Sequence, residues 1–294
     1  MPSFFRIFDQ YLLILGNVQY LGFPTINPSF IPDDYLDKKQ FVVFRTCHSI
    51  GDWALISSMP RLLKQKYPDC KVFLPSPKIL SDFFNSNAWS QWDNPFENVK
   101  LVFENNPYVD GYVDVLKGDA YHDHYRIFDF ENSEIPLIVQ MLKFWQFKDE
   151  EIKDYLPELY FSKEEIKLGN SIIKKYISNK KFGTLLLTNT LQDYYSDETN
   201  NKIFEEIEQY KNLTFFYYGS KSIKETIFKN INVIDFKELN LPIRIQLYIK
   251  TKALVNIGYQ SGINDAVCRY SKVICTPSTG NLGSNFLDSI KYLR

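Results

Sequence analysis

The sequence lacks the features that mark a disulfide-rich protein or a general nucleic-acid binder. Its 294 residues carry 34 Lys and Arg against 35 Asp and Glu, a formal net charge of −1. Such a chain has no overall positive field with which to hold nucleic acid or anionic lipid. Its four cysteines form no Cys-x-x-Cys pair, which predicts reduced thiols in a cytoplasmic protein and neither disulfides nor a zinc site.

Long apolar runs are missing as well. The longest run near the start, YLLILGNV at 11–18, falls far short of the roughly 20 residues that a membrane span needs. We therefore expect no transmembrane segment and a cytoplasmic location, with peripheral association at a membrane as the alternative. Residues 1–39 are expected to form an N-terminal extension that packs on the body.

The rest of the chain shows alternating strand-like and helix-like segments. Apolar runs rich in β-branched and aromatic residues predict strands, and apolar residues at helical spacing predict the helices between them. This alternation favours parallel sheets built from βαβ units. In the first half we expect strands at 40–46, 71–75, 99–103 and 127–130, and helices at 51–67, 78–86 and around 135–145.

The second half repeats the pattern after a charged stretch at 148–163 that predicts a crossing between domains. A helix at 163–177 is expected first, followed by strands at 183–190, 213–219, 232–236, 253–259 and 272–277 with helices between them. Two successive doubly wound domains therefore account for most of the chain. We place the N-terminal one at 40–155 and the C-terminal one at 156–294.

Two turns stand where such sheets bind ligands, beyond the carboxyl ends of strands and before a helix. In CHSIGD (47–52), Gly51 permits a tight turn, and Asp52 falls in the first helical turn, where it complements the helix dipole. In YQSGIND (259–265), the backbone amides of Gly262 and Ile263, with the Ser261 hydroxyl, form a potential phosphate cradle. Serine is also a common helix cap, so this signal is weak when taken separately.

Taken together, the two turns resemble a known family. Three stretches are similar in order and spacing to the heptosyltransferase family of GT-B glycosyltransferases. They are RTCHSIGDWALISSMPRLLKQKYPDCKVFL, NPYVDGYVDV (106–115) and NIGYQSGINDAVCRYSKVICTPS. The resemblance covers about residues 40–280. It implies two Rossmann-like domains facing across a cleft, with the acceptor on the N-terminal domain and a nucleotide-diphosphate sugar on the C-terminal one.

The resemblance also implies a reaction and its residues. Sugar transfer is expected to invert the anomeric centre without a metal or cofactor, the nucleotide sugar being a co-substrate. Asp52 matches the family's general base, and Ser261 and Gly262 match the turn beside the donor diphosphate. Further candidates on the donor side are Ile263, Thr188, Asn189 and Thr276, and on the acceptor side Gly51, His48, His122 and His124.

The sequence departs from the family at two positions. Where the family has Asp before Ser-Gly and His three residues after it, this chain has Gln260 and Asp265. An acidic side chain pointing inward would repel a diphosphate, so a donor other than ADP-heptose is expected. Two alternatives stay open: a non-catalytic protein that binds nucleotide or glycan, and a sugar-nucleotide epimerase. A glycan or lipid-linked acceptor is favoured, while the charge gives no support to a nucleic-acid acceptor.

Overall fold

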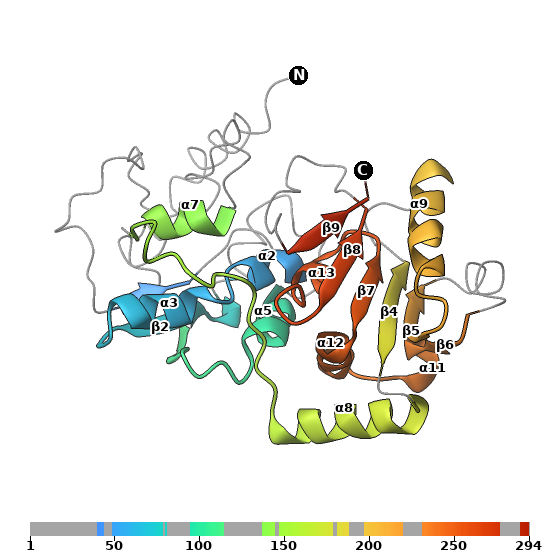
Figure 1. The fold of residues 1–294 in the computed structure, drawn as a ribbon. Helices are drawn as coiled ribbons and strands as arrows, with labels where there is room; N and C mark the ends of the chain where they lie inside the picture. Colours follow the sequence, from blue (N-terminus) through green and yellow to red (C-terminus); the bar gives the residue numbers. More distant parts are fainter. Residues whose placement is uncertain are drawn as a thin grey trace.

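The computed structural model describes residues 40–43, 49–78, 80, 95–114, 137–144, 147–178, 181–187, 197–219, 231–276 and 289–293. Within these residues the chain forms two parallel β-sheets with helices around them (Figure 1). The predicted extension at 1–39 and the predicted strand at 127–130 lie outside the described residues. The boundary predicted near residue 155 stays a prediction.

The first sheet has three described strands in the order β1-β2-β3, all parallel. They are β1 (Gln40–Val42), β2 (Lys71–Pro75) and β3 (Gly111–Val113). Strand β2 has the predicted bounds, and β1 begins where it was expected. The helices of this half are α2 (Ile50–Leu55), α3 (Met59–Lys66), α5 (Pro95–Phe103) and α7 (Leu137–Phe144).

The second sheet has six parallel strands in the order β6-β5-β4-β7-β8-β9. When the strands are renumbered from β4 in chain order, this is the doubly wound order 3-2-1-4-5-6. The strands stay parallel, and the order in which the chain adds them to the sheet changes side between β4 and β7. The strands are β4 (Phe182–Leu187), β5 (Thr214–Gly219), β6 (Val233–Asp235), β7 (Val255–Gly258), β8 (Lys272–Cys275) and β9 (Ile290–Tyr292). Five were predicted; β9 was not.

Helices cover both faces of this second sheet. Helices α8 (Lys163–Tyr176), α11 (Phe236–Leu239) and α12 (Ile243–Lys252) pack on one face, and α9 (Asp197–Glu208) packs on the other (Figure 1). Alternate strand residues point to opposite faces, as the period of a strand requires. Phe216 thus belongs to the core under α8 and α12, whereas its neighbours Phe215 and Tyr217 belong to the core under α9.

Two predictions about the first half were wrong. The run VKLVF at 99–103 was expected to be a strand but lies in helix α5, because Val99, Val102 and Phe103 follow a helical spacing on its buried face. A short apolar run does not distinguish the two structures by itself. The helix expected at 51–67 is two helices, α2 and α3. The break precedes Pro60, whose ring fits the first turn of a helix but not its interior.

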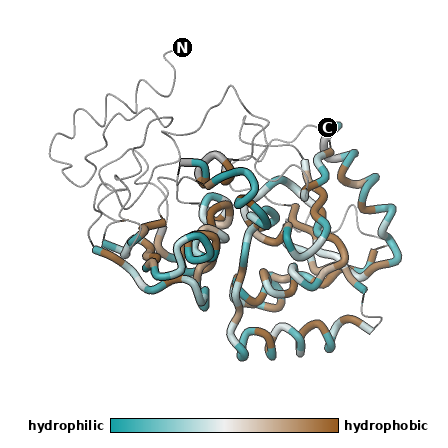
Figure 2. Tube along the Cα trace, turned by 60° about the vertical axis from the view of Figure 1, so that its left-hand side comes forward, coloured by the Kyte–Doolittle hydropathy of each residue, from teal (hydrophilic) through white to brown (hydrophobic). Residues whose placement is uncertain are grey.

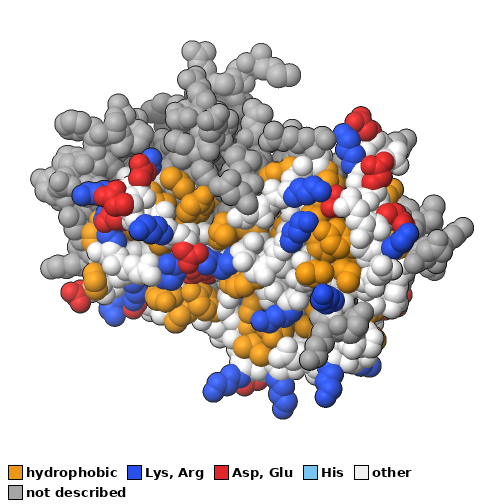
Figure 3. Space-filling model, in the orientation of Figure 1, with side chains coloured by type: hydrophobic (Ala, Val, Ile, Leu, Met, Phe, Trp, Pro, Cys, Tyr) orange, Lys and Arg blue, Asp and Glu red, His pale blue; other side chains and the backbone are white. Residues whose placement is uncertain are grey.

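One apolar core joins the two sheets. It includes β1 and α2 from the first half and the turn 266–268 with strand β8 from the second. The hydropathy view shows apolar stretches in both halves, alternating with hydrophilic ones (Figure 2). On the face drawn in Figure 3, acidic and basic side chains are interspersed. Among the described helices none is both long and apolar enough to cross a membrane.

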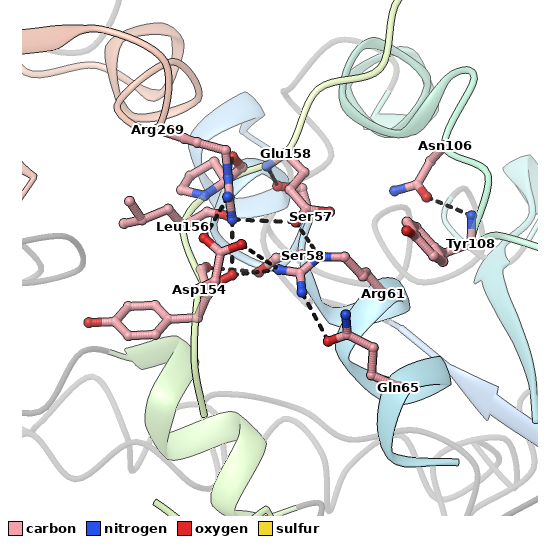
Figure 4. A network of polar contacts seen from close by, with 12 residues as sticks. Ser57, Ser58, Arg61, Gln65, Asn106, Tyr108, Asp154, Leu156, Glu158 and Arg269 are labelled. Atoms are coloured by element: carbon pink, nitrogen blue, oxygen red, sulfur yellow. Dashed lines mark hydrogen bonds and ion pairs between the residues drawn. The ribbon is translucent and has the colours of Figure 1, made fainter. Parts of the chain in front are cut away.

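Two arginines, one from each half, bind the crossing segment, residues 154–158, which links the two halves (Figure 4). Arg61 of α3 donates to Glu158 Oε1 at 2.5 Å, and Arg269 donates to the carbonyl oxygens of Leu156 at 2.8 Å and Pro157 at 2.9 Å. Arg269 also pairs with Asp154 at 2.5 Å. Because both guanidinium groups bind the same stretch at 154–158, this network ties the two halves together.

A buried lysine lies beneath the second sheet. The Nζ of Lys250 donates to Thr184 Oγ1 at 2.8 Å, and Thr184 donates to Asn256 Oδ1 at 2.5 Å. These partners are neutral, and burial lowers the pKa of Lys250 to about 7. The group therefore gives up its proton far more readily than an exposed lysine.

Candidate active site

The first of the two predicted turns is a capping box at the start of α2. Ser49 caps the helix; its Oγ accepts from the Asp52 amide at 3.4 Å and donates to Asp52 Oδ2 at 2.6 Å. The Ser49 amide donates to the same carboxylate oxygen at 3.3 Å. Asp52 is half-buried, while Trp53 beside it is fully buried and contacts Phe103 of α5 edge to face. The carboxylate is thus held at the surface of a helix whose other side is anchored in the core.

The second turn follows β7 at the point where the six-stranded sheet reverses its order. Such a position is where open α/β sheets bind ligands. Ser261 caps the short helix α13 (Gly262–Asp265), accepting from the Asn264 amide at 3.4 Å. Thr276, fully buried after β8, accepts from the Gln260 amide at 3.2 Å. The turn is therefore held by two hydrogen bonds, one within α13 and one to the residue that follows β8.

The two turns meet through glycine. A Cβ atom built on Gly262 would lie 2.1 Å from the Gly51 nitrogen and 2.5 Å from its Cα atom. A Cβ atom on Gly51 would lie 2.7 Å from the Gly262 Cα atom. Real atoms do not approach so closely, so any side chain at either position would push the two backbones apart. The starts of α2 and α13 are consequently in backbone contact, although they are far apart in the sequence.

Asp265 lies beneath this contact. Its Oδ2 is 3.5 Å from the position of a Cβ atom on Gly51 and accepts from Gln260 Nε2 at 3.1 Å. Its Oδ1 is buried without a hydrogen-bond partner in the described part of the chain. Burial, and secondarily the charge of Asp52, raise the pKa of Asp265 to about 7. Gln260 and Asp265, the two departures from the family pattern, are thus hydrogen-bonded to each other.

The structure brings together only part of the predicted set. Gly51, Asp52, Ser261, Gly262 and Ile263 lie around the contact of the two turns, and all five are partly exposed. Thr276 supports the turn from inside the protein. The remaining candidates, His48, His122, His124, Thr188 and Asn189, lie outside the described residues.

Sequence reasoning missed two participants. Ser49 stands three residues before Asp52, and Ser-x-x-Asp before an apolar run is a recognisable capping signal. Asp265 was noted only as a departure, and nothing in the sequence indicated that it would lie under Gly51. Within the described residues there is no group of three or more His, Cys, Asp or Glu side chains that could hold a metal ion.

Comparisons with known proteins identify a shared fold. A scan against protein-family models finds no match, and a search of curated proteins finds none either. Among solved structures, a glycosyl transferase family 9 protein from Veillonella parvula matches with a TM-score of 0.58 at 10% sequence identity. The match covers 88% of this chain and 86% of that one. This chain has that fold.

Two E. coli proteins match with lower scores. One is ADP-heptose LPS heptosyltransferase II, with a TM-score of 0.49, 12% identity and coverage of 87% of this chain and 90% of that one. The other is heptosyltransferase WaaC solved with ADP, with a TM-score of 0.43, 10% identity and coverage of 87% and 93%. The match to the family 9 protein confirms, at the level of the fold, the resemblance drawn from the two turns.

Proposed function

We propose that the chain is a glycosyltransferase that moves a sugar from a nucleotide-diphosphate sugar to an acceptor hydroxyl. The observation that carries the proposal is the backbone contact between Gly51 and Gly262. It joins a half-buried carboxylate to a capped helix start at the switch point of a doubly wound sheet. The shared fold with a family 9 glycosyl transferase supports the reaction class.

Each half of the site supplies one requirement of such a transfer. As the acceptor oxygen bonds to the anomeric carbon, the bond from that carbon to the donor phosphate oxygen breaks, and the acceptor proton passes to Asp52. Attack opposite to the departing diphosphate inverts the anomeric centre. General-base assistance of this kind is worth about 10²–10⁴-fold. The Ile263 amide and the Ser261 hydroxyl, at the start of α13, offer hydrogen bonds to the leaving diphosphate.

The proposed donor is a nucleotide-diphosphate sugar, and the proposed acceptor is a glycan or a lipid-linked glycan. The proposed reaction uses no metal, because the Ile263 amide and the Ser261 hydroxyl would offer the hydrogen bonds that stabilise the leaving diphosphate. A second candidate, a protein that binds nucleotide or glycan without catalysis, is favoured by the capping role of Asp52. In that protein Asp52 would serve the helix alone.

The experiment separates the base from the cap. A thermal-shift panel of nucleoside diphosphate sugars first identifies a donor, because a ligand that binds only the folded state raises its melting temperature. Transfer from that donor to glycan acceptors is then compared in Asp52→Asn and in Ser49→Ala. Ser49→Ala removes the serine cap but keeps the carboxylate, so it is a matched control.

We expect Asp52→Asn to bind the donor normally and to lose about 10²–10⁴-fold in transfer rate, while Ser49→Ala stays within several-fold of the wild type. Equal transfer rates in Asp52→Asn and Ser49→Ala would refute the role of Asp52 as general base. Conversion of the donor without any acceptor would instead indicate an epimerase.

A further inference from the structure

The packing of the two helix starts places two carboxyl groups in one environment. Asp52 approaches the contact from α2, and Asp265 approaches it from α13. Asp52 is half-buried and accepts hydrogen bonds from the Ser49 hydroxyl at 2.6 Å and from the Ser49 amide at 3.3 Å. Asp265 is 7% exposed, and the one hydrogen bond that its carboxyl accepts within the described residues comes from the neutral amide of Gln260. The two groups are therefore solvated very unequally.

The described residues around Asp265 supply no compensating positive charge. The charged group that acts on it is another carboxylate, Asp52. The thiols of Cys268 and Cys275 also face it, and burial raises the pKa of both, so they are neutral near pH 7. The guanidinium of Arg269, in the same turn, is bonded to the crossing segment at 154–158.

An ionised Asp265 would thus be a buried charge beside another carboxyl group, with one of its oxygens unpaired among the residues that the structure describes. Burying an ion without a partner is unfavourable, and the usual outcome is that the group keeps its proton.

We propose that Asp265 is a positioning residue that keeps its proton beneath Gly51 below neutral pH and thereby adds no negative charge beside Asp52 in that range. The inference rests on the proposed function, because it concerns the base of that reaction. It adds that the departure from the family imidazole introduces no second negative charge where a diphosphate must approach. When Asp265 ionises, its negative charge repels the diphosphate and weakens its binding.

The direct test needs no substrate. Carboxyl carbons of aspartate are labelled with ¹³C in the full chain and titrated by NMR, and the Asp265 and Asp52 signals are assigned by their loss in Asp265→Asn and Asp52→Asn. We expect the Asp265 carboxyl of the wild type to titrate near neutral pH, and Asp52→Asn to lower its midpoint by about one pH unit or more. An Asp265 signal that titrates below about pH 5, or that is unaffected by Asp52→Asn, would overturn the proposal.

A second measurement follows the consequence for binding. ADP, UDP, GDP and CDP are titrated into the wild type and Asp265→Asn from pH 6 to pH 8.5. Affinity for the nucleotide that binds should fall about tenfold above the Asp265 midpoint in the wild type and stay level in Asp265→Asn. Parallel pH profiles would contradict the proposal. If none of the four binds, the proposed function fails, while the carboxyl titration still decides the protonation of Asp265.

Discussion

Replacing Asp265 by Asn should make the protein more stable at pH 8 and should remove a pH dependence that the wild type shows. The folded wild type keeps the Asp265 proton at pH values where the unfolded chain has already released it. Between its ordinary pKa of 3.8 and the folded pKa of about 7, the folded state therefore binds more protons, and stability falls as the pH rises. Asn cannot ionise and still accepts from Gln260.

The magnitude follows from those two pKa values. A difference of this size corresponds to at most about 4 kcal/mol above pH 7, at about 1.4 kcal/mol per pKa unit. Relaxation around a buried pair reduces such effects, so we expect about 2–4 kcal/mol. Urea unfolding of both proteins from pH 5 to pH 9 measures it. Asp149→Asn, at a carboxyl that is 79% exposed, is the control and should change little. Curves for the wild type and Asp265→Asn that remain parallel from pH 5 to pH 8 would refute the reasoning.

Three further changes test other parts of the structure. Gly262→Ala should lower the free energy of unfolding by about 1–3 kcal/mol, because its Cβ atom would overlap the Gly51 backbone; unchanged stability in urea would mean that the turns are not in contact. Arg269→Lys should cost about 1–3 kcal/mol, since lysine cannot span the carbonyl oxygens of Leu156 and Pro157 together, and a stability equal to that of the wild type would argue against this role of Arg269. Between pH 7 and pH 10 the unfolded chain keeps the Lys250 proton that the folded state has released, so the stability of the wild type should rise with pH. Lys250→Met should flatten that rise, and an unaltered slope would contradict the burial of a lysine with a lowered pKa.

The second half of the fold could be predicted because its strands are long and wholly apolar. The run at 182–187 is buried at every position, as a central parallel strand requires. The first half was harder, because its strands are short and its helices have similar composition. VKLVF fits a strand by residue type and a helix by spacing, and only packing against α2 decides between them. Strand β9 is three residues long and carries a lysine, so it gave little signal.

The candidate site was predictable where it depends on local chemistry. Gly51 and Gly262 each lie in the first turn of a helix that follows a strand, and this pattern was sufficient to expect that they would face one ligand. Their direct contact was not predictable, because it depends on how two sheets pack. The same holds for Asp265, because Gly51, beneath which it lies, is more than 200 residues away in the sequence. It also holds for Arg61 and Arg269, which look like ordinary surface cations in the sequence.

A crystal structure with a bound nucleoside diphosphate tests the central claim most directly. The nucleotide would be the one that raises the melting temperature most in the panel. We predict that its diphosphate lies at the start of α13, within hydrogen-bond distance of the Ser261 hydroxyl and the Ile263 amide, with the Asp52 carboxylate facing the sugar side. A diphosphate bound at another place, with Asp52 remote from it, would contradict the account.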